Sequence, residues 1–165
     1  MCIWPEHCLV GSNGHALVDD IWAALQRWTG MTGRDVEMLL KGQNPLTEMY
    51  SACAAEVPLT PTTSMNFPWI DSLIQPSVSS LKTTTTKESS GNHTLLVCGQ
   101  AMSHCVNYTL RDIVLRWESL GRPCEIILVT DGCSAVPGFE DAAKDFQASM
   151  QAAGVKLATA EEVFA

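Results

Sequence analysis

The chain has 165 residues, of which 46% are hydrophobic and 17% are charged, and its formal net charge is −8. This composition is typical of a globular domain that buries its own core, and an acidic chain without a Lys/Arg cluster is not expected to bind nucleic acid or an anionic membrane. No apolar run approaches the roughly 20 residues that span a bilayer, and the N-terminus does not resemble a signal peptide, so we expect a cytoplasmic protein.

The N-terminal part predicts one helix and one strand. After Asn13-Gly14, apolar side chains recur on one helical face, and Gly30 is expected to end the helix. The residues of that face are Leu17, Ile21, Leu25 and Trp28. Val36–Leu40 predicts a short strand that ends at Lys41-Gly42.

The middle of the chain is predicted to be mostly irregular. Residues 58–68 contain several Pro and Thr residues and predict a loop, and a brief helix is expected over 69–74. Residues 77–92 include four consecutive threonines followed by small polar residues. This low complexity predicts a disordered surface insertion at about 77–92.

The C-terminal part alternates buried-type strands with amphipathic helices. Strands are expected near 94–98, 125–130 and 155–158, and the apolar run of the second is typical of a parallel strand buried on both faces. Helices are expected over about 105–120 and 139–152, before a terminal turn at 160–164. Repeated βα units predict one three-layer α/β/α domain over residues 1–165, with a parallel sheet.

The seven cysteines do not form an obvious disulfide or zinc pattern, because their number is odd and no two are arranged as Cys-x-x-Cys. Most of them are expected to act as small hydrophobic residues in a reducing compartment. These are Cys53, Cys98, Cys124 and Cys133.

Cys105 is the main chemical candidate. It follows the strand near 94–98 and a turn at Gly99, and it lies in the first turn of the expected helix. Ligands of open α/β sheets bind at the carboxyl ends of strands, and the positive end of a helix favours a thiolate. Cys105 could therefore attack a carboxamide carbonyl and form an acyl-enzyme, or it could be a buried cysteine of a core helix.

Several motifs, in this order, resemble the cysteine-hydrolase superfamily of nicotinamidases and isochorismatases, with the nicotinamidase branch as the closer match. They are Trp4-Pro5-Glu6-His7-Cys8, Lys41-Gly42, Tyr50-Ser51 and Gly99-Gln100-Ala101-Met102-Ser103-His104-Cys105-Val106, followed by Thr109. The resemblance covers nearly the whole chain and implies an isochorismatase-like hydrolase fold. It also implies an amidase of pyridine nucleotide biosynthesis, which converts nicotinamide to nicotinate and ammonia.

The resemblance implies roles for the residues that match the motifs. Cys105 would be the nucleophile, and Lys41 would belong to a Cys-Lys-Asp triad in which the ammonium supports the thiolate. The backbone N–H groups of Ala101 and Cys105 would form an oxyanion hole, and a cis peptide bond would precede Ala101. Without the resemblance, Lys41 would be an ordinary solvated lysine at a strand end.

The remaining motif residues are implied to bind substrate or metal. Trp4 and Tyr50 would be flat walls of the pocket, although either could be a core aromatic, and His104 would be a hydrogen-bonding pocket residue. His7 would be one ligand of a divalent metal, zinc or similar, that orients the substrate ring nitrogen. Because tight sites need three or four ligands, we do not expect this chain to hold that metal tightly.

Two family motifs have no counterpart before Trp4. The first family strand carries the triad aspartate in an Asp-x-Gln motif, and the second leads to an Asp-x-His pair of metal ligands. We therefore expect this chain to be N-terminally truncated and to supply strands three to six of a six-stranded sheet.

The expected function is hydrolysis of a small carboxamide through a Cys105 acyl-enzyme, although the activity of the chain alone stays open. The alternatives are a catalytically incomplete member that acts as a subunit, an isochorismatase-type hydrolase of another small substrate, and an unrelated α/β binding domain. The expected partner is a small amide, and homo-oligomer formation stays open.

Overall fold

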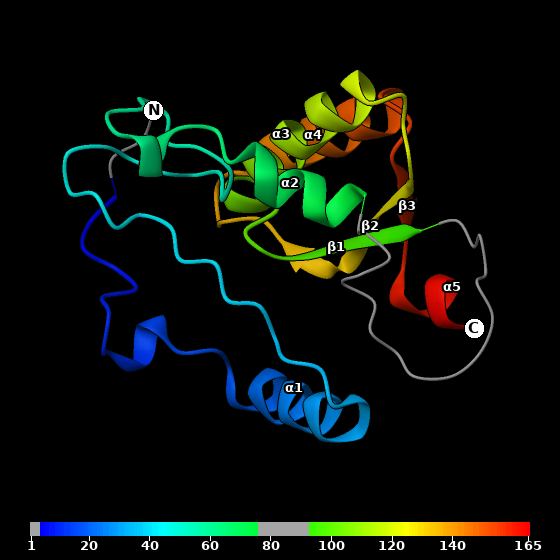
Figure 1. The fold of residues 1–165 in the computed structure, drawn as a ribbon, viewed down its shortest axis with the longest axis horizontal. Helices are drawn as coiled ribbons and strands as arrows, with labels where there is room; N and C mark the ends of the chain where they lie inside the picture. Colours follow the sequence, from blue (N-terminus) through cyan, green and yellow to red (C-terminus); the bar gives the residue numbers. More distant parts are fainter. Residues whose placement is uncertain (1–3, 76–92) are drawn as a thin grey trace. The chain divides into compact units, whose positions relative to one another are not determined.

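The computed structural model describes residues 4–75 and 93–165 (Figure 1). The chain divides into two compact units, Met1–Leu40 and Lys41–Ala165. The insertion predicted at 77–92 lies outside the described residues. That the whole chain is a single domain stays a prediction.

The first unit contains a short 3-10 turn, Asn13–His15, and helix α1, Asp19–Thr32. The prediction that Gly30 ends this helix is wrong, because α1 continues to Thr32 and ends at Gly33. Gly33 has a φ of 65°, the left-handed conformation that commonly terminates helices and that glycine adopts without strain.

The strand expected at Val36–Leu40 is not formed. These residues lack regular structure, and all except Val36 are exposed. A short segment becomes a strand only through hydrogen bonds to a neighbouring strand, and the strands of the described residues pair with one another instead. The apolar pattern carried no information about a pairing partner.

The second unit is built on three parallel strands in the order β1-β2-β3. They are β1 (Thr94–Gln100), β2 (Glu125–Ser134) and β3 (Lys156–Ala158). Leu95 pairs with Ile126, and Leu128 pairs with both Val97 and Leu157. The parallel α/β arrangement predicted from the sequence is therefore confirmed, with the first two strands longer than expected.

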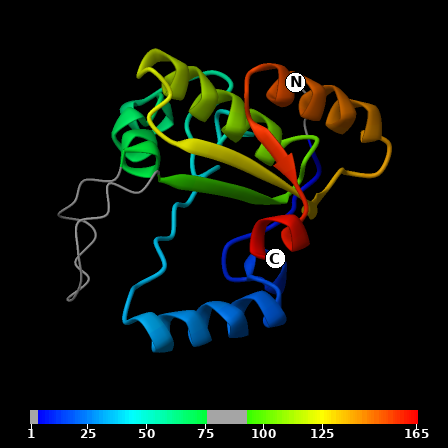
Figure 2. The same cartoon turned by 90° about the vertical axis from the view of Figure 1, so that its right-hand side faces the viewer.

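Helices lie on both faces of this sheet (Figure 2). On one face are α3 (Cys105–Ser119) and α4 (Glu140–Ala152), whose bounds agree with the predicted helices. On the other is α5 (Ala160–Phe164), a one-turn helix that Thr159 and Glu162 cap reciprocally. Three layers result, with the sheet in the middle.

The main core lies between the sheet and the helices α3 and α4. Its fully buried side chains include Leu110 of α3, Leu128 of β2 and Phe146 of α4. Cys53 and Cys124 belong to this core, as predicted, and Cys133 is half-buried. Cys98 is exposed, contrary to expectation, because strand side chains alternate and its neighbour Val97 is the one that packs against the core.

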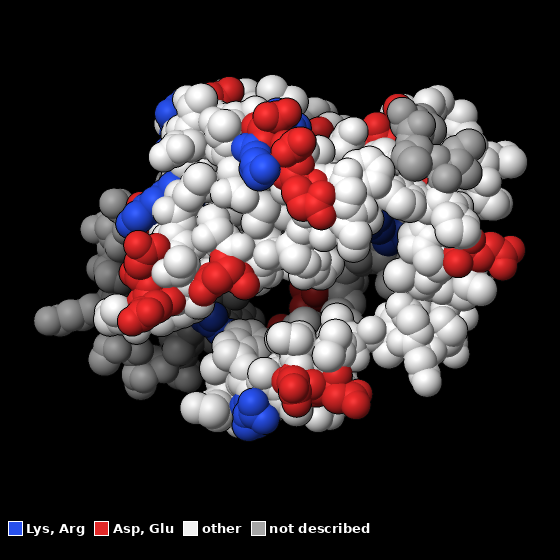
Figure 3. Space-filling model, turned by 180° about the vertical axis from the view of Figure 1, so that it is seen from behind, with Lys and Arg blue, Asp and Glu red and all other residues white. Residues whose placement is uncertain are grey.

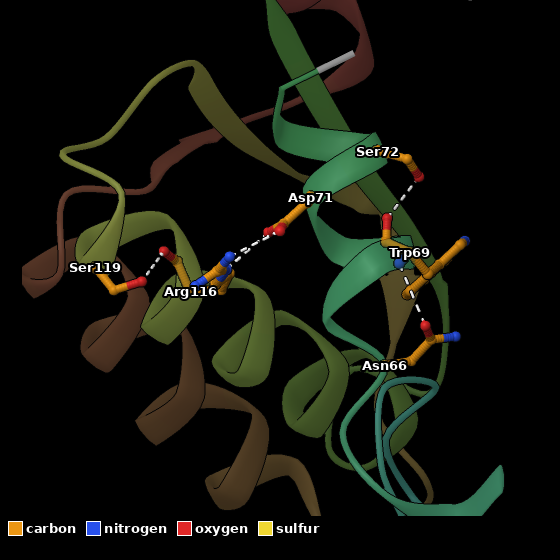
Figure 4. Close-up of polar contacts among 6 residues, drawn as sticks. All are labelled: Asn66, Trp69, Asp71, Ser72, Arg116 and Ser119. Carbon is orange, nitrogen blue, oxygen red and sulfur yellow. Dashed lines mark hydrogen bonds and ion pairs between the residues drawn. The ribbon is translucent and has the colours of Figure 1, made fainter. Parts of the chain in front are cut away.

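Helix α2 (Phe67–Ile74) packs against α3, and a bidentate ion pair between Asp71 and Arg116 joins the two helices (Figure 4). Arg116 Nε donates to Asp71 Oδ1 and its Nη2 donates to Asp71 Oδ2, both at 2.7 Å. The Arg116 guanidinium also lies 5.2 Å from the centre of the Phe67 ring. Asn66 begins the helix by accepting the Trp69 N–H at 3.3 Å. These contacts fix the orientation of α2 on α3.

Replacing Asp71 by asparagine is expected to destabilise the protein in a pH-dependent way. The hydrogen bonds from Arg116 hold the pKa of the Asp71 carboxyl below its ordinary value. A lowered carboxyl pKa contributes stability above the unfolded-state value of about 3.9, and this is lost as the pH falls through the folded-state value. Urea unfolding should therefore separate wild type from Asp71→Asn at neutral pH, and the two should converge in acid.

The matched control is Asp141→Asn, because the Asp141–Lys144 pair is exposed and such pairs contribute little. A stability difference between wild type and Asp71→Asn that stays constant from neutral to acidic pH would contradict the role given to this carboxylate.

Charged side chains of both signs are scattered over the face shown in Figure 3, where basic residues stand among acidic ones. Within residues 4–75 and 93–165, no helix is both long and apolar enough to cross a membrane.

Candidate active site

The turn that joins β1 to α3 carries the main candidate residues. Gly99, near the end of β1, has a φ of 124°, which a residue with a side chain rarely adopts, and the pairing of β1 with β2 shifts register between Val97 and Gly99. The peptide bond between Gln100 and Ala101 is cis, so this expectation is confirmed. The Ala101 carbonyl accepts the N–H groups of His104 at 3.0 Å and Val106 at 3.1 Å. Ala101 is thereby held against the first turn of α3.

The end of β2 supports this turn from the neighbouring strand. The Met102 N–H donates to the Ser134 carbonyl at 2.8 Å, and the Ser134 hydroxyl donates to Gln100 Oε1 at 2.8 Å. The Val136 N–H donates to Ser103 Oγ at 3.0 Å. The position of the β1–α3 turn is therefore set by hydrogen bonds from a second segment and does not depend on local sequence alone.

Cys105 is the first residue of α3, a helix of 15 residues, and its side chain is half-buried. The first N–H groups of a helix have no partner within that helix, and they form its positive end. In the part of the chain that the structure describes, the N–H groups of Ala101 and Cys105 show no protein acceptor. These two N–H groups belong to the turn that carries the thiol, and their role as an oxyanion hole stays a prediction.

Aromatic rings surround His104, the residue before Cys105. The His104 ring packs edge-to-face on Tyr50, at 5.6 Å between ring centres, and on Phe139, at 4.7 Å. Burial lowers the pKa of the His104 imidazole, so the neutral form is favoured at neutral pH. The structure therefore brings the predicted residues Tyr50 and His104 together beside the candidate nucleophile.

Tyr50 lies beside His104 because a hydrogen bond joins its segment to α3. The Ala52 N–H donates to Thr109 Oγ1 at 2.9 Å, and Tyr50 itself is buried, with its ring 5.1 Å from that of Tyr108. Tyr108 and Phe139 were missed by sequence reasoning. The helical spacing of Tyr108 from His104 was a usable signal, whereas Phe139 lies outside every motif.

Lys41 is exposed, and its Nζ donates to the Met49 carbonyl at 2.6 Å. Met49 directly precedes Tyr50, so the Lys41 ammonium is hydrogen-bonded to the segment that carries Tyr50. The described residues show no hydrogen bond between Lys41 and Cys105. The structure thus places Lys41 at the Tyr50 segment and leaves its triad role a prediction.

Trp4 and His7 belong to the first unit, where Trp4 is half-buried and His7 is exposed. The His7 Nδ1 makes a local hydrogen bond of 2.8 Å to the Pro5 carbonyl. Among the described residues, no group of three or more His, Cys, Asp or Glu side chains could hold a metal ion. The described residues do not fit the divalent-metal site implied for the family.

Comparisons with known proteins give limited similarity. No protein-family model matches the sequence, and no curated protein matches it. Among solved structures, an isochorismatase family protein from Desulfovibrio vulgaris subsp. vulgaris str. Hildenborough matches at 28% identity, with a TM-score of 0.29. The match covers 40% of this chain and 30% of that protein, so the chain spans less than a third of its length.

Cys105 is expected to be the cysteine most rapidly alkylated by iodoacetamide at neutral pH, because it combines access with a helix N-terminus. Burial raises the pKa of Cys53 to about 12 and also raises the pKa of Cys124 and Cys133. Peptide mapping by mass spectrometry gives the rate at each site. Exposed Cys98 is the internal control, and equal labelling of Cys98 and Cys105 would count against a special thiol.

Proposed function

We propose that this chain is a cysteine hydrolase in which Cys105 attacks the carbonyl carbon of a small aromatic carboxamide, as nicotinamidases do. The observation that carries the proposal is the position of Cys105. It begins α3 at the carboxyl end of β1, in one turn with the Ala101 N–H and beside the rings of His104 and Tyr50. This is where parallel α/β sheets bind their ligands.

The reaction follows from these groups. The Cys105 thiolate forms a bond to the carbonyl carbon, and the carbonyl π electrons move to the oxygen, where the N–H groups of Ala101 and Cys105 can donate to them. Collapse of this intermediate breaks the C–N bond, and the nitrogen leaves as ammonia after taking up a proton from solvent. Water then attacks the thioester carbonyl, which releases the carboxylic acid, returns the thiolate and gives one proton back to solvent.

The aromatic surroundings favour a flat substrate. Edge-to-face contacts already join Tyr50, His104 and Phe139, and a planar ring can pack against such a group. Nicotinamide is the substrate we propose, through the motif resemblance. Lys41 would support the thiolate, and its attachment at Met49, next to Tyr50, is compatible with that role.

Two observations favour the alternative of a catalytically incomplete family member. Lys41 donates to a backbone carbonyl, and among the described residues no group of three or more side chains could hold a metal ion together with His7. A protein with the turn but without its triad would serve as a subunit or an interaction protein. An isochorismatase-type hydrolase of another planar substrate would use the same ring contacts.

Ammonia release by the purified 165-residue chain tests the proposal, with nicotinamide, benzamide and acetamide as substrates. The proposal predicts release from the two aromatic amides above that from acetamide. Faster turnover of acetamide would exclude the aromatic pocket. If no amide yields ammonia and none acylates Cys105, the catalytically incomplete alternative is favoured.

A further inference from the structure

Ser103 occupies an unusual place between the candidate site and the end of β2. Its side chain is buried, with 3% exposure, and its Oγ has two neighbours. The Val136 N–H donates to this oxygen at 3.0 Å, and His104 Nδ1 lies 2.9 Å from it. The Ser103 carbonyl accepts from Asn107 Nδ2 at 3.3 Å, so backbone and side chain are both held.

The donors and acceptors around Ser103 Oγ determine the direction of the Ser103–His104 hydrogen bond. A hydroxyl carries one proton, and the Val136 N–H can only donate, so it uses a lone pair of Oγ. The hydroxyl proton needs an acceptor because a buried donor without one is costly. Within the described residues, His104 Nδ1 is the acceptor in reach. Nδ1 therefore accepts, and in a neutral imidazole the proton is then on Nε2.

We propose that Ser103 is a positioning residue that holds His104 as the neutral imidazole protonated on Nε2, and thereby fixes a hydrogen-bond donor on the residue next to Cys105. The rings of Tyr50 and Phe139 hold the imidazole plane, and Ser103 determines which nitrogen bears the proton. A donor of this kind suits a substrate with an acceptor, either the carboxamide oxygen or a ring nitrogen. This last step alone rests on the proposed function.

Proton-detected ¹⁵N spectra of the chain labelled in its histidines test the proposal, because protonated and unprotonated ring nitrogens resonate far apart. Two other histidines serve as references. His93 Nε2 lies 2.6 Å from the Leu73 carbonyl and His7 Nδ1 lies 2.8 Å from the Pro5 carbonyl, so each of these nitrogens must carry the proton. His104→Gln assigns the remaining signals.

At neutral pH, His104 should show a protonated Nε2 and an unprotonated Nδ1. Ser103→Ala should reduce this preference, and Ser103→Thr, which keeps the hydroxyl, should restore it. A wild-type His104 protonated on Nδ1 would overturn the proposal even if both variants fail to fold. So would an unchanged His104 pattern in a folded Ser103→Ala protein.

The activity measurements separate this proposal from the proposed function. If ammonia release is found, Ser103→Ala should lower kcat/KM about tenfold, as the loss of one oriented hydrogen bond would. The control Ser149→Ala, at a half-buried serine of α4 whose hydroxyl donates locally to the Asp145 carbonyl, should leave kcat/KM unchanged. Normal kcat/KM in Ser103→Ala, together with a disturbed His104 signal, would disprove the substrate contact and leave the tautomer assignment standing. Absence of ammonia release in the wild type would disprove the proposed function, and the spectra would still decide the tautomer.

Discussion

Cys105→Ala should abolish ammonia release, with a loss of at least about 10³-fold, because alanine cannot form the covalent intermediate. The fold should survive, since the replaced side chain is small and half-buried, and stability should change by no more than about 1 kcal/mol. Ammonia assays and thermal unfolding of the same preparation check both parts. Cys105→Ser, which keeps a hydroxyl at the same place, should be nearly as inactive because its oxygen is a much weaker nucleophile at neutral pH.

Cys98→Ala is the matched control for this change. Cys98 lies on β1, close to the same turn in the sequence, but its thiol is exposed and stands outside the proposed chemistry. Its replacement should leave turnover within about twofold of wild type, as expected for a surface substitution. If Cys105→Ala releases ammonia as fast as Cys98→Ala does, the Cys105 thiol is not the nucleophile.

Phe146→Ala should lower the free energy of unfolding by about 3–5 kcal/mol, the usual cost of removing a buried phenylalanine. Phe146 is fully buried on α4, in the core between the helices and the sheet. The Arg111 guanidinium lies 5.9 Å from the centre of its ring, so the truncation also removes a cation–π contact. Denaturant titration followed by circular dichroism measures the loss, which is a large fraction of the stability of an ordinary domain.

Phe164→Ala provides the comparison, because Phe164 in α5 is 75% exposed. Its replacement should change the unfolding free energy by less than about 0.5 kcal/mol. Similar losses for Phe146→Ala and Phe164→Ala would show that the core between the sheet and α4 does not dominate stability.

The elements that sequence reasoning found are those whose pattern reflects burial. The run from Ile126 to Val129 is apolar at every position because both faces of β2 are covered, and α3 shows a helical apolar stripe because one of its faces meets the core. Val36–Leu40 is apolar at every position except Glu37, yet it is not a strand. Hydrogen bonding to a neighbouring strand is a property of the fold, and a five-residue window carries no record of it.

In the candidate site, too, the features that could be predicted are local in sequence, and those that could not depend on distant residues. The motif around Cys105 predicted the cis bond before Ala101, because that property is local to one turn. The substrate-binding role of His104 stays a prediction, and the structure shows its ring in contact with the ring of Tyr50. The role of Ser103 depends on Val136, which is 33 residues away, and the contact of His104 with Phe139 also crosses from another element. Sequence patterns cannot predict such partners, because the contacts form only once the fold brings the end of β2 beside the β1–α3 turn.

The central claim is that Cys105 forms a covalent bond to the acyl group of its substrate. The most direct measurement is to mix the chain with nicotinamide, quench the reaction in acid within the first turnovers, and locate any acyl group by peptide mass spectrometry. The account predicts one nicotinoyl group, on the peptide that contains Cys105. An acyl group on any other cysteine, or ammonia release without a Cys105 adduct at any quench time, would contradict it.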